Sequence, residues 1–226
     1  MKRLLLGVAL LAFATMAAAP KTKLPDKPLP AEAAFVATAT QDLNSKYKTP
    51  ADAEKDGYFR YTNEDSTGAI SYANLKWNSA ADPQHPQPSQ LWYDVKGRLI
   101  GADFSVPLTK ANNNAPPVLW GLDAQRWMTF KHAHVHYILK DPKGTMTYGR
   151  AVSGKSYLAA GGNFDAPTAA PLVKMKKAAA AARVAKVFVF PAQYDIEIWL
   201  TPNPLGAFAA KDPLIHPSAA AEKPQM

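Results

Sequence analysis

Residues 127–152, WMTFKHAHVHYILKDPKGTMTYGRAV, contain the pattern that decides the fold. Apolar, aromatic and β-branched residues dominate 127–140, which we interpret as one long strand. Asp141-Pro142-Lys143-Gly144 is a strong turn signal, because proline presets the φ of one turn position and glycine tolerates a positive φ. Residues 145–152 then return as the partner strand. The stretch therefore predicts an antiparallel hairpin.

The segments on either side of this hairpin alternate between helical and strand patterns. Helices are predicted at 31–47, from Thr49-Pro50 onward and at 168–183. Strands are predicted at 58–61, 70–77, 91–95, 99–106, 186–190 and 194–200, with Pro191 bending the chain between the last two. Helices first, then antiparallel strands with one late helix, predict an α+β domain. Its sheet is expected to be either open or closed towards a barrel.

The first 19 residues have the features of an export signal. Lys2 and Arg3 form a positive start, and residues 4–14 form an apolar core that is too short to span a bilayer. We therefore predict a signal peptide over 1–19 and an exported protein, either periplasmic or secreted. The rest divides into a Pro/Lys-rich linker, a single globular domain and a flexible tail, over residues 20–30, 31–212 and 213–226.

Composition excludes several classes of function. The chain has no cysteine, so it has no disulfide, no cysteine-ligated zinc and no thiol nucleophile. Its net charge of +8 is scattered along the chain, which argues against a nucleic-acid partner. After the signal no stretch is long and apolar enough for an integral membrane protein. Residues 149–156 match a nucleotide-binding loop but lack a buried strand before them and a long helix after them, so we expect no nucleotide.

Three of the five histidines, His132, His134 and His136, occupy alternate positions of the predicted long strand. Strand side chains alternate between faces, so the three share one face while the apolar residues between them take the other. Alternate residues lie about 6.5–7 Å apart at the backbone, so two imidazoles can bind one ion at about 2.0–2.1 Å. The third is expected as an outer ligand, a group that orients the ligands, or a proton carrier.

Two acids repeat this spacing. Asp195 and Glu197 share one face of the strand 194–200, and Ile196 and Ile198 take the other. If that strand is the neighbour of the histidine strand, carboxylates and imidazoles meet in one site suited to zinc, iron or manganese, whereas imidazoles alone favour zinc or copper. We predict one zinc or copper ion at a site drawn from His132, His134, His136, Asp195 and Glu197.

Catalysis is a further step that the sequence leaves open. In a metal-dependent hydrolase or redox enzyme, Glu197 is the candidate general base beside a metal-activated water. A second acid pair, Asp94 and Asp103, is a weaker candidate for sugar hydrolysis.

Three classes of function therefore stay open. The first is the metal site. The second is a metal-free module that binds a small molecule or carbohydrate, with aromatic faces drawn from Trp77, Trp92, Trp120, Trp127 and Trp199. The third is a structural envelope protein, a homo-oligomer whose apolar strands pair between subunits. A histidine ladder that merely tolerates water is the functionless alternative.

Overall fold

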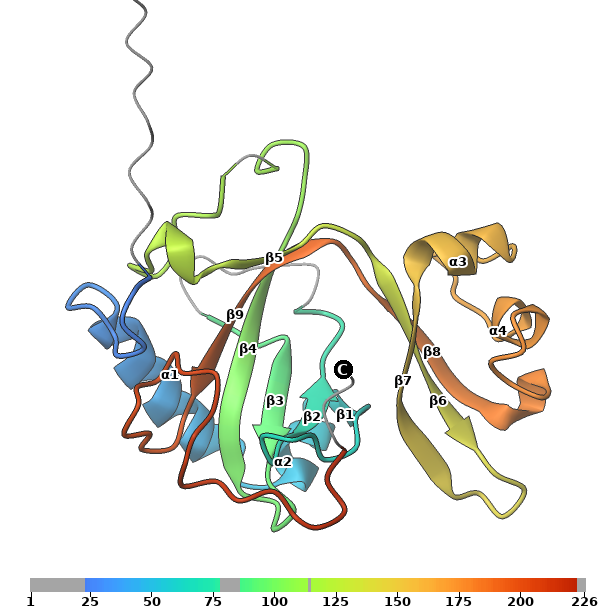
Figure 1. The fold of residues 1–226 in the computed structure, drawn as a ribbon, viewed down its shortest axis with the longest axis horizontal. Coiled ribbons are helices and arrows are strands. Elements are labelled where there is room, and N and C mark those ends of the chain that lie inside the picture. The colour runs from blue at the N-terminus through green and yellow to red at the C-terminus, as the bar shows by residue number, and fades with distance from the viewer. Residues whose placement is uncertain (1–22, 78–85, 114, 223–226) are drawn as a thin grey trace, which may run out of the picture.

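The computed structural model describes residues 23–77, 86–113 and 115–222. The predicted signal peptide lies outside the described residues, and so does much of the proline-rich stretch that follows Trp77. The described residues form an α+β fold with two antiparallel sheets (Figure 1). The predicted fold class is therefore confirmed. Within the described part of the chain, neither sheet closes into a barrel.

Each sheet has its own strand order. The larger sheet runs β1-β2-β3-β4-β9-β5, with β1 at Phe59–Arg60, β2 at Ile70–Ala73, β3 at Gln90–Tyr93, β4 at Leu99–Pro107, β9 at Gln193–Trp199 and β5 at Met128–Phe130. The smaller sheet runs β7-β6-β8, with β7 at Met146–Ser153, β6 at His134–Lys140 and β8 at Val184–Phe190. The β6–β7 hairpin is the one predicted from residues 127–152, and its turn contains Gly144 with a φ of 88°.

The predicted long strand 127–140 is wrong as one element. It divides into β5, which pairs with β9 in the larger sheet, and β6, which pairs with β8 in the smaller sheet. β8 and β9 divide in the same way at Pro191, where the predicted bend is confirmed. Figure 1 shows these two chain segments passing side by side from one sheet to the other. Residues 131–133 are needed for this crossing, so they leave the strand pleat.

The helices agree with the sequence at the N-terminal end and differ later. α1 spans Ala33–Lys46, and α2 spans Pro50–Lys55 with a capping box between Thr49 and Asp52. The predicted late helix 168–183 is reduced to α4, Ala170–Lys174, because Lys176 adopts a φ of 58° that helical residues do not. A further short helix and two 3₁₀ turns complete the set: α3 at Gly154–Ala159, η1 at Ala124–Arg126 and η2 at Ala181–Arg183.

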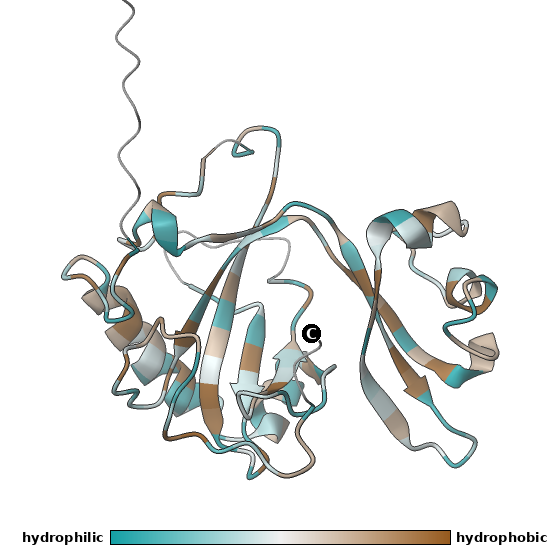
Figure 2. Ribbon diagram, in the orientation of Figure 1, coloured by the Kyte–Doolittle hydropathy of each residue, from teal (hydrophilic) through white to brown (hydrophobic). Residues whose placement is uncertain are grey.

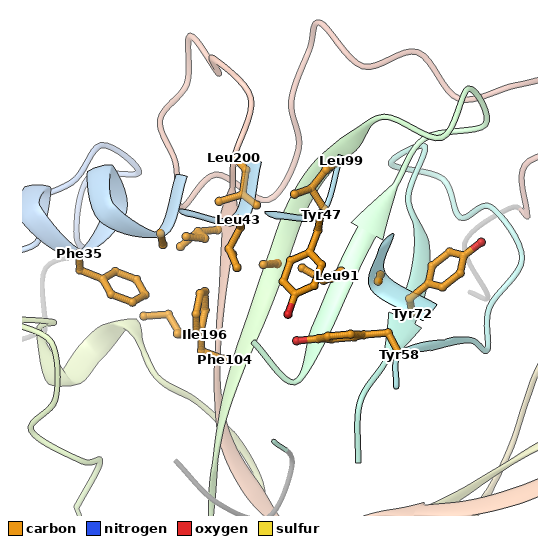
Figure 3. Packing of buried hydrophobic residues seen from close by; sticks show 14 of the residues in the cluster. Phe35, Leu43, Tyr47, Tyr58, Tyr72, Leu91, Leu99, Phe104, Ile196 and Leu200 are labelled. Carbon is orange, nitrogen blue, oxygen red and sulfur yellow. The ribbon is translucent and has the colours of Figure 1, made fainter. Parts of the chain in front are cut away.

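The main core lies between α1 and one face of the larger sheet (Figure 3). Phe35 of α1 packs edge-on against Phe104 of β4 at 5.1 Å between ring centroids. In the smaller sheet, Val135 and Tyr137 of β6 pack with Tyr157 of α3 and Leu172 of α4. Figure 2 shows hydrophobic residues along the strands of both sheets. A third cluster, which includes Tyr61, Ile138, Phe188 and Phe190, joins the two sheets.

Segments near both ends of the described chain make specific contacts. The Arg126 guanidinium pairs with the buried carboxylate of Glu32 at 2.9 Å and also donates to the Pro25 and Lys27 carbonyls. Towards the other end, Ile215 is buried and the Ser218 amide donates to Glu64. The division into linker, domain and tail stays a prediction. Among the described residues, no helix is both long and apolar enough to cross a membrane.

Candidate functional site

A cavity of about 350 Å³ lies between the two sheets and collects most of the residues singled out in the sequence. Its floor is the face of the larger sheet opposite α1. Its other side comes from β6 and β8 of the smaller sheet and from the loop that follows β1. Its polar and aromatic lining includes Tyr61, Gln90, Trp92, Asp103, His134, His136, Phe190, Gln193, Asp195, Glu197 and Trp199.

Strand β9 supplies the densest row of polar groups. Gln193, Asp195 and Glu197 all line the cavity, whereas Ile196 and Ile198 are buried in the main core. The predicted alternation of this strand is therefore confirmed. It follows from the pleat, which turns successive side chains to opposite faces.

Strand β4 adds a second row that lies directly beside the first. Asp103 is the register partner of Glu197, and Ser105 is the partner of Asp195. Side chains directly opposite each other in an antiparallel pair have Cβ atoms about 4.5–5.5 Å apart. The result is a cluster of three carboxyl groups on two neighbouring strands.

Strand β6 brings two of the three histidines to the same cavity. His134 and His136 line it, and their rings lie 4.9 Å apart between centroids. His132 lies before the strand, is exposed and does not line the cavity, so its predicted place beside the other two is wrong. The reason is the crossing at residues 131–133, which ends the alternation one residue before β6 begins.

The sequence left open whether the histidine strand and the acidic strand are neighbours. The neighbours of β6 are β7 and β8, not β9, so the two strands do not pair. Asp195 and Glu197 instead share the cavity with His134 and His136 from the other sheet. Within the described residues, no group of three or more His, Asp or Glu side chains is arranged to hold a metal ion.

Aromatic rings enclose His136. Its ring stacks on Phe188 at 5.4 Å and meets Tyr61 and Phe190 edge-on at 5.1 Å and 5.0 Å between centroids. Burial, and to a lesser extent the neighbouring His134, lower the pKa of His136 to about 3. The imidazole is therefore neutral at physiological pH. Its Nδ1 atom is buried and has no hydrogen-bond partner among the described residues.

The pKa values of the three carboxyl groups are shifted in the opposite direction, upward. Burial raises the pKa of Asp103 and of Asp195 well above the usual range, and the nearby acids raise both further. Glu197 reaches solvent, yet the surrounding protein removes enough water to raise its pKa, and Asp65 adds to the effect. Carboxyl groups this close cannot all ionise readily without a positive charge nearby.

Hydrogen bonds fix the buried end of the cluster. Ser105 Oγ donates to Asp195 at 3.1 Å, Gln193 Nε2 donates to Ser105 Oγ at 3.1 Å, and Ser89 lies 2.6 Å from Ser105. The Tyr61 hydroxyl donates to Gln90 on β3. These contacts hold the polar side chains in place and leave Asp103 Oδ1 and Gln193 Oε1 buried without partners in the described structure.

Sequence reasoning undervalued Asp103 and missed Tyr61, Gln90 and Gln193. Asp94, the other acid of the predicted pair, does not line the cavity with Asp103. Its carboxylate accepts backbone hydrogen bonds in the β3–β4 turn. The signal that could have found the others is the polar alternation of two apolar strands, Gly101-x-Asp103-x-Ser105 and Gln193-x-Asp195-x-Glu197. A strand that buries one face and carries acids on the other indicates a lined cavity.

Comparison with protein-family models, with curated proteins and with solved structures finds no match to this chain.

Proposed function

We propose that this protein binds a small organic cation in the cavity between its two sheets. The observation that carries the proposal is the acidic character of the lining. Four acids line the cavity, Asp65, Asp103, Asp195 and Glu197, with no lysine or arginine among the described lining residues. Together with the predicted signal peptide, this makes the chain an exported binding protein, either periplasmic or secreted.

The acidic lining contrasts with the rest of the chain. The net charge is +8, so acids gathered in one cavity do not reflect a generally acidic surface. Carboxylates in a cavity with little water attract cations more strongly than the same groups do in bulk solvent. A bound cation would supply the missing countercharge, and the acids would release protons as it binds.

The aromatic lining favours an organic cation. Tyr61, Trp92, Phe130, Phe190 and Trp199 all line the cavity. Ring faces attract cations through their quadrupole and bury the apolar part of a ligand. The volume of about 350 Å³ lies within the range of small-molecule sites, about 300–1,000 Å³.

A transition-metal ion in the same cavity is the second candidate. Two neutral imidazoles, His134 and His136, and two acids, Asp195 and Glu197, line one cavity, and these are ligand types that zinc accepts. Elemental analysis of protein purified without an affinity tag tests it, and His134→Ala with His136→Ala should abolish the uptake of zinc or copper. Glu197 as general base belongs to this candidate alone.

The test of the cation proposal compares two probes of the same shape. Benzylammonium and benzyl alcohol are titrated into the full mature chain by calorimetry at about pH 8. Benzylammonium is expected to bind with a Kd of about 1 mM or tighter, and benzyl alcohol at least about tenfold more weakly. Equal affinity for the two, or no binding of either, contradicts the proposal.

Neutral variants of the acids sharpen this test. Asp103→Asn and Glu197→Gln keep the side-chain shape and remove a charge, so each should weaken benzylammonium binding by at least about tenfold. Asp42→Asn on α1 changes the net charge by the same amount at an exposed position outside the cavity, so it should bind like the parent. A loss of affinity in all three variants would mean that net charge, not the cavity, decides binding.

A further inference from the structure

The buried polar atoms of the cavity show an imbalance between hydrogen-bond donors and acceptors. Three atoms of lining residues are buried without a partner in the described structure: Asp103 Oδ1, Gln193 Oε1 and His136 Nδ1. The amide oxygen of Gln193 is an acceptor, and Asp103 Oδ1 is one in the ionised form that a bound cation favours. His136 Nδ1 is an acceptor in the tautomer that carries its proton on Nε2. The Asp103 and Gln193 side chains are at least nine-tenths buried, at 4% and 2% exposure.

Three donors of the lining are already engaged. Tyr61 donates to Gln90, the Gln193 amide donates to Ser105, and Trp199 Nε1 donates to the Ala209 carbonyl at 2.7 Å. None of these three reaches Gln193 Oε1 or Asp103 Oδ1, which have no partner among the described residues. Buried polar groups in folded proteins are nearly always paired, so an excess of one kind indicates what a ligand brings.

We infer that the cationic group of the ligand carries N–H donors, as a protonated primary amine or a guanidinium does, and is not a quaternary ammonium. This inference rests on the proposed function. A quaternary ammonium satisfies the charge and the aromatic rings but leaves Gln193 Oε1 and the ionised Asp103 Oδ1 without a hydrogen-bond donor. A primary ammonium or a guanidinium adds charge-assisted hydrogen bonds to the same electrostatic attraction.

A graded series of probes tests the inference. Benzylammonium, benzyldimethylammonium and benzyltrimethylammonium have the same ring and charge, and their N–H donors fall from three to one to none. Calorimetric affinities are expected to fall in that order, with the first at least about tenfold tighter than the last. Equal binding of all three overturns the inference and leaves the proposed function intact. Failure of every member to bind overturns both.

A variant of one acceptor separates hydrogen bonding from size. Gln193→Met keeps the length of the side chain and removes its acceptor, together with its bond to Ser105. Loss of the acceptor should weaken benzylammonium by about tenfold and leave benzyltrimethylammonium unchanged. The matched control is Gln41→Met on α1, at an exposed position outside the cavity, which should change neither affinity. Equal weakening of both probes in Gln193→Met, or of neither, contradicts the inference.

Discussion

The two faces of the larger sheet are made from the same strands, yet they are built in opposite ways. On β4, Ala102 and Phe104 belong to the main core, Asp103 lines the cavity, and Ser105 bonds to Asp195 beside it. The side chains of the core face are stabilised by apolar contacts with one another and with α1. The cavity face leaves acids without countercharge and acceptors without donors. Apolar packing is therefore concentrated on one face of this sheet, and the residues of the proposed binding site lie on the other.

The largest loss of stability is expected from a substitution on the core face. Phe104 is fully buried and contacts Phe35 and Trp120, so Phe104→Ala should lower the free energy of unfolding by about 3–5 kcal/mol. Its neighbour in sequence, Ser105, lies on the other face, and Ser105→Ala, which removes its bonds to Asp195 and Gln193, should cost about 1–2 kcal/mol. Urea denaturation measures both. Similar losses would mean that the two faces do not differ in this way.

A smaller effect on stability is expected at Gly101, where the Trp92 ring lies against the backbone of β4. Gly101 on β4 has no room for a Cβ, which would collide with the Trp92 ring and approach the Ile198 carbonyl oxygen to 2.9 Å. Gly101→Ala should therefore displace Trp92 and destabilise the fold by about 1–3 kcal/mol. Urea denaturation and tryptophan fluorescence report the two changes. A variant as stable as the parent, with unaltered fluorescence, would contradict this packing.

The stability of the protein at acid pH should reveal that His136 is neutral in the folded state. His136 has a folded pKa of about 3, and the unfolded pKa is about 6.5, so the unfolded chain binds an extra proton between these values. Stability is therefore lost as pH falls from about 6.5 to about 3, by up to about 1.4 kcal/mol per pH unit. His136→Phe should reduce this slope. His132→Phe, at an exposed position, should retain it, and equal slopes in the two variants would count against the assignment.

The smallest effect is expected at Asp103, whose contribution to stability depends on pH in the opposite direction. Burial raises the pKa of Asp103, so the unfolded chain loses this proton at a lower pH than the folded chain does. Stability is therefore greatest below the unfolded pKa and falls as pH rises above about 4. Asp103→Asn should raise the free energy of unfolding by about 1 kcal/mol at neutral pH and above while binding is lost. Asp42→Asn should leave stability within about 0.5 kcal/mol. A destabilised Asp103→Asn would show that the cavity face contributes to folding.

Local patterns predicted much of this architecture. The helix start at Thr49-Pro50, the turn at Gly144 and the bend at Pro191 follow from residue chemistry within a few positions, and the structure contains all three. The shortened late helix shows where such reasoning weakens. Residues 168–183 are rich in alanine, but only five of them form α4. Alanine-rich composition favours a helix without specifying where it ends, because the surrounding tertiary contacts decide that.

The sequence by itself determined the α+β class and which residues share a face within β6 and within β9, because pleat alternation depends only on the local chain. Only the tertiary structure decided that 127–140 breaks between two sheets, that His132 lies outside the cavity, and that Asp103 lies beside Glu197. Those facts depend on which distant strands pair, and that choice comes from the burial of whole faces, not from the spacing of residues along one strand.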